Sequence, residues 1–234
     1  IGQHGAGYLE LYDKKLRTEV KPAEKLIVWG KKIFSDKVFP TFNFTVLNKK
    51  ENKFLGKKLT IVFRSSGVRT VPFDRFEYGK ILYDKTAEII ENLSDEIKKK
   101  TLLRLHPNYK KGIYFTFDYF IKKNKYLKID NKTKYHKLLI DSKIVIFNDF
   151  SSGFLQNLTL NYPSIVFSPL GLSFIHEENK TDFEELIKIK LIFTDVKSLN
   201  NHLNKIWNNT ETWWNDTSNV KVRKIFLEKY SLKP

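Results

Sequence analysis

The sequence has neither cysteine nor methionine among its 234 residues. Without cysteine, a disulfide bond and a thiolate metal site are both excluded. This composition is typical of a cytoplasmic protein, so we expect the chain to act in the cytoplasm. Because an open reading frame begins with methionine and this sequence begins with Ile1, we also expect the chain to be a fragment whose upstream part is missing.

Long apolar runs are also lacking, since none approaches the ~20 residues that a membrane-spanning helix needs. The longest runs, such as Ile144–Phe147, have the length of a strand. Hydrophobic residues make up 41% of the chain and aromatic residues 15%. That content is enough for a core, so general disorder is excluded.

Acidic residues are few relative to basic ones, and the 42 Lys and Arg against 26 Asp and Glu give a net charge of +16. Such a charge attracts nucleic acid, anionic lipid or phosphorylated substrates, although a lysine-rich composition is also typical of an AT-rich genome. Four Trp and eleven Tyr make a nucleic-acid-binding module an alternative. The basic residues are scattered through every segment, however, and form no stripe, so we expect no nucleic acid partner.

Short apolar runs alternate with amphipathic segments from residue 59 onward, which predicts parallel strands joined by helical crossovers. The fold class we expect is α/β, with a Rossmann-like parallel sheet and helices on both faces. The expected strands are Leu59–Phe63, Leu102–Leu105, Tyr126–Ile129, Lys143–Phe147, Ser164–Phe167 and Leu191–Phe193. The expected helices are Asp74–Leu93, Asp118–Asn124, Lys132–Asp141, Gly153–Asn161, Asp182–Lys188, Val196–Trp207 and Val220–Tyr230.

A domain boundary is predicted near residue 55, where the polar, lysine-rich segment Asn48–Lys58 has the composition of a loop or linker. Residues 1–55 differ from the rest because they hold a glycine-rich segment and only one short strand candidate, Leu26–Val28. We therefore assign residues 1–55 to the end of one domain plus a linker, and residues 56–234 to a second domain.

Three small, polar or basic loops follow strands of the second domain. Taken singly, His106 could merely cap a loop, and Asp149 or Ser151 could be an ordinary helix cap. The carboxyl ends of parallel strands meet at one edge of a sheet, however, and ligands bind there. Together the loops predict a site for a phosphate-bearing ligand. They are Arg64-Ser65-Ser66-Gly67-Val68-Arg69, Arg104-Leu105-His106-Pro107 and Asp149-Phe150-Ser151-Ser152.

The order of several motifs resembles that of the CDP-glycerol glycerophosphotransferases and of a related group of bacterial surface-carbohydrate transferases. Bacterial sialyltransferases and Kdo transferases are similar in their His-Pro and Ser-Ser pairs. The tail Thr212-Trp213-Trp214-Asn215 is similar to that of the second group. The motifs are Gln3-His4-Gly5, Arg104-Leu105-His106-Pro107, Asp149-Phe150-Ser151-Ser152 and Asn161-Tyr162-Pro163-Ser164-Ile165-Val166-Phe167.

This resemblance implies the GT-B architecture, in which two Rossmann-like domains face a cleft. The chain would hold the end of the N-terminal, acceptor-side domain and the whole C-terminal domain that binds the nucleotide-activated donor. It implies an enzyme that transfers a sugar, or a polyol phosphate, from that donor to a cell-surface glycan. Ala6-Gly7-Tyr8 replaces the Thr and Lys-rich turn of the glycerophosphotransferases, which favours a sugar donor.

The resemblance also implies roles for individual residues. His4 would be the catalytic base, and the residues that contact the donor's phosphates would be His106, Pro107, Ser151 and Ser152. The loop argument adds Ser65, Ser66 and Arg104 to the phosphate site. Glu177 is a candidate for the donor's ribose or sugar, with a solvated loop as the alternative.

We expect no catalytic metal, because the chain contains no Asp-x-Asp sequence and GT-B folds commonly work without metal. No cofactor is expected beyond the donor itself, for which CMP- and CDP-linked compounds are the candidates. The acceptor would be a glycan or a lipid-linked glycan, which leaves peripheral contact with the inner face of the membrane open. The pair Trp213 and Trp214 could pack on the protein or lie at a lipid interface, and packing is favoured. A domain that has lost activity and serves only for docking is the remaining alternative.

Overall fold

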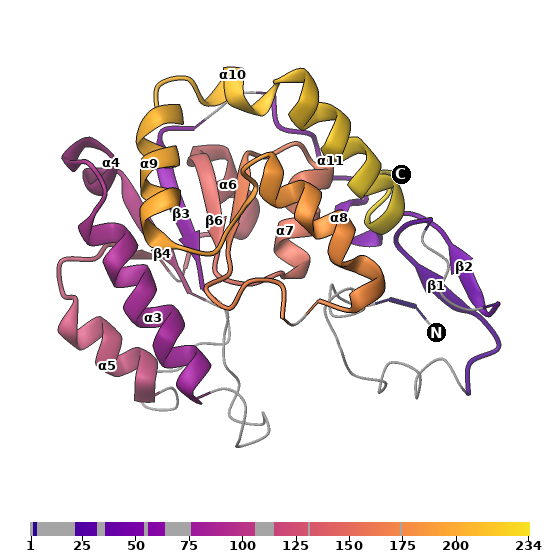
Figure 1. Ribbon diagram of the computed structural model, residues 1–234, viewed down its shortest axis with the longest axis horizontal. Coiled ribbons are helices and arrows are strands. Elements are labelled where there is room, and N and C mark those ends of the chain that lie inside the picture. The colour runs from indigo at the N-terminus through magenta and orange to yellow at the C-terminus, as the bar shows by residue number, and fades with distance from the viewer. Residues whose placement is uncertain are drawn as a thin grey trace.

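The computed structural model describes residues 2–3, 22–31, 36–53, 56–63, 76–105, 115–130, 132–173 and 175–234. Its centre is a six-stranded, wholly parallel sheet in the order β5-β4-β3-β6-β7-β8 (Figure 1). Counted along the chain this is the order 3-2-1-4-5-6 of a doubly wound Rossmann-like sheet. The strands are β3 (Lys58–Val62), β4 (Thr101–Arg104), β5 (Ile129–Asp130), β6 (Ser142–Phe147), β7 (Ser164–Phe167) and β8 (Ile192–Phe193).

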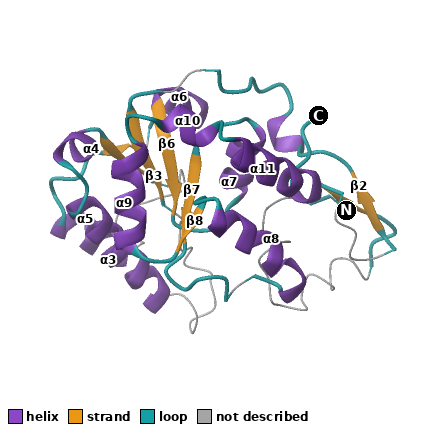
Figure 2. Cartoon of the chain, turned by 45° about the horizontal axis from the view of Figure 1, so that its top comes forward, coloured by secondary structure: helices purple, strands orange, loops and turns teal. Residues whose placement is uncertain are grey.

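Helices cover both faces of this sheet, as the sequence predicts. Successive side chains of a strand point to opposite faces, so Ile144 and Ile146 of β6 join one core cluster while Val145 and Phe147 join the other. The first cluster includes residues of α3 (Phe76–Glu91), α4 (Asp95–Lys99), α5 (Phe115–Lys123) and α9 (Val196–Ile206). The second includes residues of α6 (Tyr135–Asp141), α7 (Ser152–Thr159), α8 (Glu177–Lys188), α10 (Thr210–Trp214) and α11 (Thr217–Tyr230). Figure 2 shows the helices on both sides of the strands.

The predicted α/β class is therefore confirmed, and the element bounds differ at some elements. Helix α8 begins at Glu177, well before Asp182, where the sequence placed its start, so Glu177 lies in a helix and not in a loop. The strand expected at Tyr126–Ile129 lies instead at Ile129–Asp130, because Asn124–Tyr126 forms a turn in which the Leu127 N–H donates to the Asn124 carbonyl. Helices α4 and α10 have only five residues each and were not predicted.

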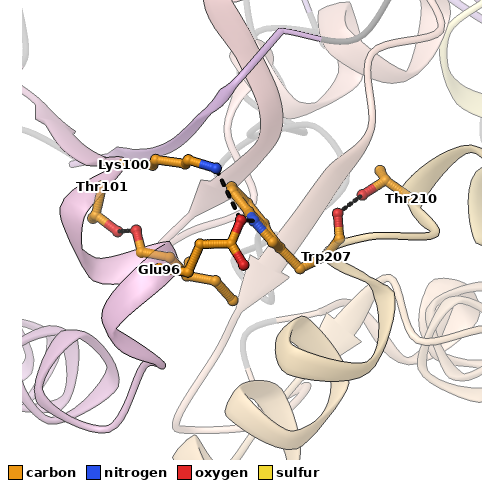
Figure 3. A network of polar contacts seen from close by, with 6 residues as sticks. Glu96, Lys100, Thr101, Trp207 and Thr210 are labelled. Atoms are coloured by element: carbon orange, nitrogen blue, oxygen red, sulfur yellow. Dashed lines mark hydrogen bonds and ion pairs between the residues drawn. The ribbon is translucent and has the colours of Figure 1, made fainter.

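A network of polar contacts joins α4 to the end of α9 at the edge of the sheet where the strands begin (Figure 3). The buried Trp207 indole donates a hydrogen bond to Glu96 Oε1 at 3.0 Å, and Lys100 Nζ donates to the same oxygen at 2.8 Å. These hydrogen bonds, that of Lys100 first, lower the pKa of Glu96. Lys143 Nζ lies 4.8 Å from the Trp207 ring centroid, and burial, followed by repulsion from Lys100, lowers the pKa of Lys143.

A second, two-stranded parallel sheet precedes the main one and consists of β1 (Leu26–Val28) and β2 (Val38–Pro40). It is followed by the 3-10 helix η1 (Phe44–Val46). Trp29, directly after β1, is 1% exposed and packs in the core cluster that contains α7 and α11. The end of the chain holds this small sheet in place, because Leu232 N–H donates to the Trp29 carbonyl at 2.6 Å and Asn43 N–H donates to the Leu232 carbonyl at 2.8 Å.

The tryptophan pair of the tail packs on the protein. Trp214 is 3% exposed, and its indole N–H donates to Asn161 Oδ1 at 2.7 Å. The Arg223 guanidinium stacks 3.5 Å from the Trp214 ring centroid. Among the residues described, none forms a helix long and apolar enough to cross a membrane.

The close approach of β1 to α11 generates a prediction at Gly30. A Cβ atom there would lie 2.1 Å from the Lys229 carbonyl oxygen, whereas a Cβ on Gly2 would meet nothing within 4 Å. We expect Gly30→Ala to lower the free energy of unfolding by about 2–3 kcal/mol, because backbone must move to relieve the overlap. Urea unfolding of both variants measures this, and a Gly30→Ala variant as stable as Gly2→Ala would contradict the close packing.

Candidate functional site

The candidate site is the edge of the main sheet where its parallel strands end. At this edge β3 lies between β4 and β6, with Val62 paired to Arg104 on one side and to Phe147 on the other. The chain order reverses there, so successive crossovers leave on opposite faces and a crevice forms beyond the strand ends. Asn148 N–H donates to the Val62 carbonyl at 3.4 Å. The loop that leads into α7 therefore starts at this switch point.

Helix α7 begins at the switch point with Ser151 as its N-cap residue. Ser151 has the extended backbone of a cap, φ −102° and ψ 164°, but its hydroxyl makes no capping hydrogen bond. The first turn of α7, all of which is described, carries no acidic residue. A helix N-terminus has a partial positive charge and backbone N–H groups that suit an anion.

Two neighbouring helices start at the same edge, and in each of them acidic side chains of the helix itself offset the partial positive charge of its N-terminus. Helix α8 has Glu177 and Glu178 in its first turn. Helix α9 has Asp195 as its N-cap, whose carboxylate accepts the Ser198 N–H at 2.8 Å. This hydrogen bond is the first cause of the lowered pKa of Asp195. Compared with these two helices, α7 is the one whose N-terminus best fits an external anion.

Gly153, in the first turn of α7, allows the helix to start close against β6. A Cβ atom at this position would lie 2.9 Å from Cε1 of the buried Phe147 ring, 3.5 Å from Ser151 Oγ and 3.5 Å from the Tyr135 hydroxyl. With any larger residue here, either the Phe147 ring or the start of α7 would have to shift. The Ser-Ser-Gly sequence therefore combines two hydroxyls with the residue that lets them approach the switch point.

Tyr135, at the start of α6, also reaches this region, and sequence reasoning missed it. Its hydroxyl donates to Asn157 Oδ1 on α7 at 3.1 Å. Burial raises the pKa of Tyr135, so the phenol stays protonated and keeps donating this bond. A tyrosine at the start of an amphipathic helix has no sequence signal that separates it from a core residue.

Arg104, the last residue of β4, is 6% exposed and donates to Asp130 Oδ1 at 3.3 Å. The same carboxylate oxygen accepts the backbone N–H groups of Lys132 and Thr133 at 2.9 Å each. Burial opposes ionisation of Asp130, but the bonds from Thr133 and Lys132 and the Arg104 charge outweigh it and lower the pKa of Asp130. Asp130 thus holds Arg104 across the ends of β4 and β5. The sequence did not reveal this pair. The contact of Arg104 with phosphate stays a prediction.

The remaining predicted residues have different outcomes. Glu177 is the first residue of α8, and its side chain is 74% exposed and paired with Lys180. It lies on the helix that follows β7, at the predicted edge, and its contact with the donor stays a prediction. Five predicted site residues lie outside the described part of the chain: His4, Ser65, Ser66, His106 and Pro107. Within the described part, no group of three or more His, Cys, Asp or Glu side chains could hold a metal ion.

Solved structures with a similar fold include TarM and a single-residue variant of the wall teichoic acid polymerase TagF. TarM is 14% identical with a TM-score of 0.55, and the match covers 98% of this chain and 47% of TarM. The TagF variant is 14% identical with a TM-score of 0.50, and the match covers 94% of this chain and 56% of TagF. The chain therefore has the Rossmann-like fold of these proteins and spans about half their length.

The sequence matches the model of the LIC12162 family transferase over residues 1–233. The chain therefore belongs to this family of transferases. A search of curated proteins found no match. The expected enzyme class, a transferase, is confirmed by the family.

The cap geometry of α7 generates a stability prediction. Removing a capping hydroxyl or carboxylate costs about 1 kcal/mol. We expect Asp195→Ala, which removes a formed cap, to lower the free energy of unfolding by about this amount, and Ser151→Ala to change it by less than about 0.3 kcal/mol. Urea unfolding compares the two variants. Equal losses would show that Ser151 is an ordinary cap.

The Arg104–Asp130 pair generates a prediction of pH dependence. The pKa of Asp130 in the folded state lies below its ordinary value of 3.8. The pair therefore stabilises the fold fully above pH 3.8, and this stabilisation is lost as the pH falls through the folded-state pKa. We expect Asp130→Asn to cost about 2 kcal/mol at pH 7, because Arg104 loses its charge partner, and the difference from the parent protein to shrink as the pH falls below 3.8.

Asp141→Asn is the matched control, because Asp141 pairs with Lys58 at 3.1 Å through side chains that are 61% and 48% exposed. An exposed pair contributes about 0.5 kcal/mol or less. Unfolding by urea at pH 7, 5 and 2.5 gives the comparison. If Asp130→Asn lowers the free energy of unfolding by the same amount at all three pH values, an ionised Asp130 paired with Arg104 is contradicted.

Proposed function

We propose that this chain is the donor-binding half of a GT-B transferase that moves a sugar, or a polyol phosphate, from a nucleotide-activated donor to a cell-surface glycan. The observation that carries the proposal is the start of α7 at the switch point of the sheet. There a helix N-terminus without acidic residues in its first turn presents Ser151, whose hydroxyl makes no capping bond. An anionic diphosphate is the ligand chemistry that such an N-terminus favours.

The similarity to TarM and TagF supports the surface-glycan part of the proposal. TagF is a wall teichoic acid polymerase, and this chain covers about half of each structure. Residues 1–55 would then be the end of the N-terminal, acceptor-side domain with its linker, and residues 56–234 the donor domain. The small sheet of β1 and β2 fits this division, because a two-stranded parallel sheet of three-residue strands is stable only beside further structure.

In this mechanism the donor's phosphates lie at the N-terminus of α7. Ser151 and Ser152 donate hydroxyl hydrogen bonds to them, and the helix dipole stabilises the negative charge that the departing nucleotide acquires as its bond to the transferred group breaks. Arg104 lies at the neighbouring strand end, where Asp130 holds its guanidinium in place as a further hydrogen-bond donor for the phosphates. The negative charge is thereby stabilised by the protein's own groups, without a metal ion.

The residues outside the described part would complete the site from the other strand ends. Ser65 and Ser66 follow β3, and His106 with Pro107 follows β4. Val62 of β3 pairs with Arg104 of β4, so the two strand ends that precede these loops lie side by side. His106 would bind phosphate, and His4 would take the proton of the acceptor hydroxyl as it attacks.

The donor we propose is CMP- or CDP-linked, with Glu177 at the ribose or the sugar. The acceptor would be a glycan or a lipid-linked glycan. We place the enzyme in the cytoplasm of a bacterium, at the inner face of the membrane, with no nucleic acid as a partner.

Calorimetry with CMP, CDP, UDP and GDP tests the donor site. We expect one of the cytidine nucleotides to bind, and Ser151→Ala, Ser152→Ala and His106→Ala each to weaken it by about tenfold, because each removes a hydrogen bond to a charged group. Ser198→Ala is the matched control, since Ser198 lies in the first turn of α9, which Asp195 already caps. Failure of all four nucleotides to bind a chain that includes the upstream domain would refute the proposal, and salt-sensitive binding of DNA instead would favour a nucleic-acid-binding module.

A further inference from the structure

Strand β6 carries an irregularity at its start, beside the polar network that joins α4 to α9. Lys58 of β3 pairs with Ser142, but the next residue, Leu59, pairs with Ile144. Lys143 is therefore an extra residue of β6 that has no partner on β3. Such a bulge redirects a side chain, and bulges are frequent beside functional sites.

The bulge turns the Lys143 side chain toward the face of the sheet that α9 covers. The Ser142 hydroxyl donates to the Leu138 carbonyl of α6, so Ser142 points to the other face. Ile144 packs in the core cluster that contains Trp207, and Lys143 Nζ lies 4.8 Å from the centroid of the Trp207 ring. In a regular strand Lys143 and Ile144 would point to opposite faces, whereas the bulge brings both to the same one.

The amine of Lys143 has no carboxylate partner in the described part of the chain. Figure 3 shows how Lys100 and the Trp207 indole converge on Glu96, which is thereby engaged by two donors. Lys143 Nζ makes no hydrogen bond or ion pair with a described residue. Its positive charge meets the face of the Trp207 ring instead, and Lys100 Nζ lies 5.9 Å from the centroid of the same ring.

These surroundings favour the uncharged form of the Lys143 amine. Burial is the first cause that lowers the pKa of Lys143, and repulsion from Lys100 is the second, while attraction to Glu96 and Glu211 opposes them. An amine that is partly desolvated and placed beside another cation is an activated nucleophile. Lys143 therefore has more unprotonated, reactive amine at neutral pH than an ordinary lysine.

The edge of the sheet where the strands begin also gathers lysines that are scattered in the sequence. Because all six strands are parallel, the residues that precede or open them meet at one edge. This edge is opposite to the candidate donor site. Its positive charge attracts small anions. The exposed lysines at the starts of β3, β4 and β5 are Lys57, Lys58, Lys99, Lys100 and Lys128.

We propose that Lys143 is a site of acylation by small acyl phosphates. The Nζ lone pair attacks the carbonyl carbon, a C–N bond forms, and the bond from that carbon to the phosphate oxygen breaks. Phosphate leaves with the electron pair of that bond, and the amine loses a proton to water. The product is an uncharged amide on the face of Trp207, so the repulsion from Lys100 ends. This inference goes beyond the proposed function and does not depend on it.

Incubation of the full chain with acetyl phosphate at pH 7.5 tests the proposal, with peptide mass spectrometry to measure the acetylation rate of each lysine. We expect Lys143 to react at least about tenfold faster than Lys188, because more of its amine is unprotonated. Lys188 is the matched control. Its side chain is 69% exposed, but a hydrogen bond from its amine to Glu185 at 2.6 Å raises its pKa. If exposure alone decided the rates, Lys188 would react faster, and that result would overturn the proposal.

Two variants of Lys100 test the cause of the reactivity. Lys100→Met ends the repulsion and frees Glu96 to pair with Lys143, so we expect acetylation of Lys143 to slow by about fivefold or more. Lys100→Arg keeps the charge and should leave the rate unchanged. An unchanged rate in a folded Lys100→Met variant would contradict the activation of Lys143 by this cluster.

The pH dependence in the parent protein keeps the test decisive if Lys100→Met fails to fold. Because its pKa is lowered, the acetylation rate of Lys143 should reach half its maximum at a lower pH than the rate of Lys188. Coincident pH profiles for the two lysines would overturn the proposal.

Discussion

The structure depends on the pairing of β3 with two parallel neighbours, β4 and β6. A parallel pair requires a crossover, and right-handed crossovers change face here because the chain runs from β3 through β4 to β5 on one side and then returns to β6 on the other side of β3. The two faces then acquire separate cores, and the strand ends that carry polar loops meet at a single edge. The burial of both core clusters and the assembly of the candidate site are consequences of the same hydrogen-bonded ladder.

Much of the fold could be predicted from the sequence, because strands buried on both faces leave a continuous apolar run. Ile144–Phe147 is such a run, and it lies in β6 as expected. The strand near Tyr126 was placed too early, since β5 has only two residues and the aromatic residue before it belongs to a turn. The short helices α4 and α10 were missed because five residues hold too little periodicity to detect.

The candidate site was predictable only where its residues adjoin strand ends. Ser151 and Ser152 could be placed at a helix start because a buried strand precedes them and an apolar helix follows. Asp130 and Tyr135 could not, since their roles depend on contacts with Arg104 and with α7 that no local pattern encodes. A serine at this position favours a capped helix, so the sequence predicts that the Ser151 hydroxyl makes a capping hydrogen bond. Whether it does depends on the geometry of the side chain, and in the structure it makes none.

The hydrogen bond between Asn43 and Ser231 joins residues 188 positions apart. During synthesis the small sheet of β1 and β2 emerges before the central sheet, but the chain segment that fastens it emerges after the central sheet is complete. The central domain can therefore reach its final form while the sheet before it still lacks its anchor, and the closing contacts are the ones with the greatest sequence separation. Removing the segment from Ser231 onward would therefore leave the Rossmann-like core with its own contacts and the small N-terminal sheet without its anchor.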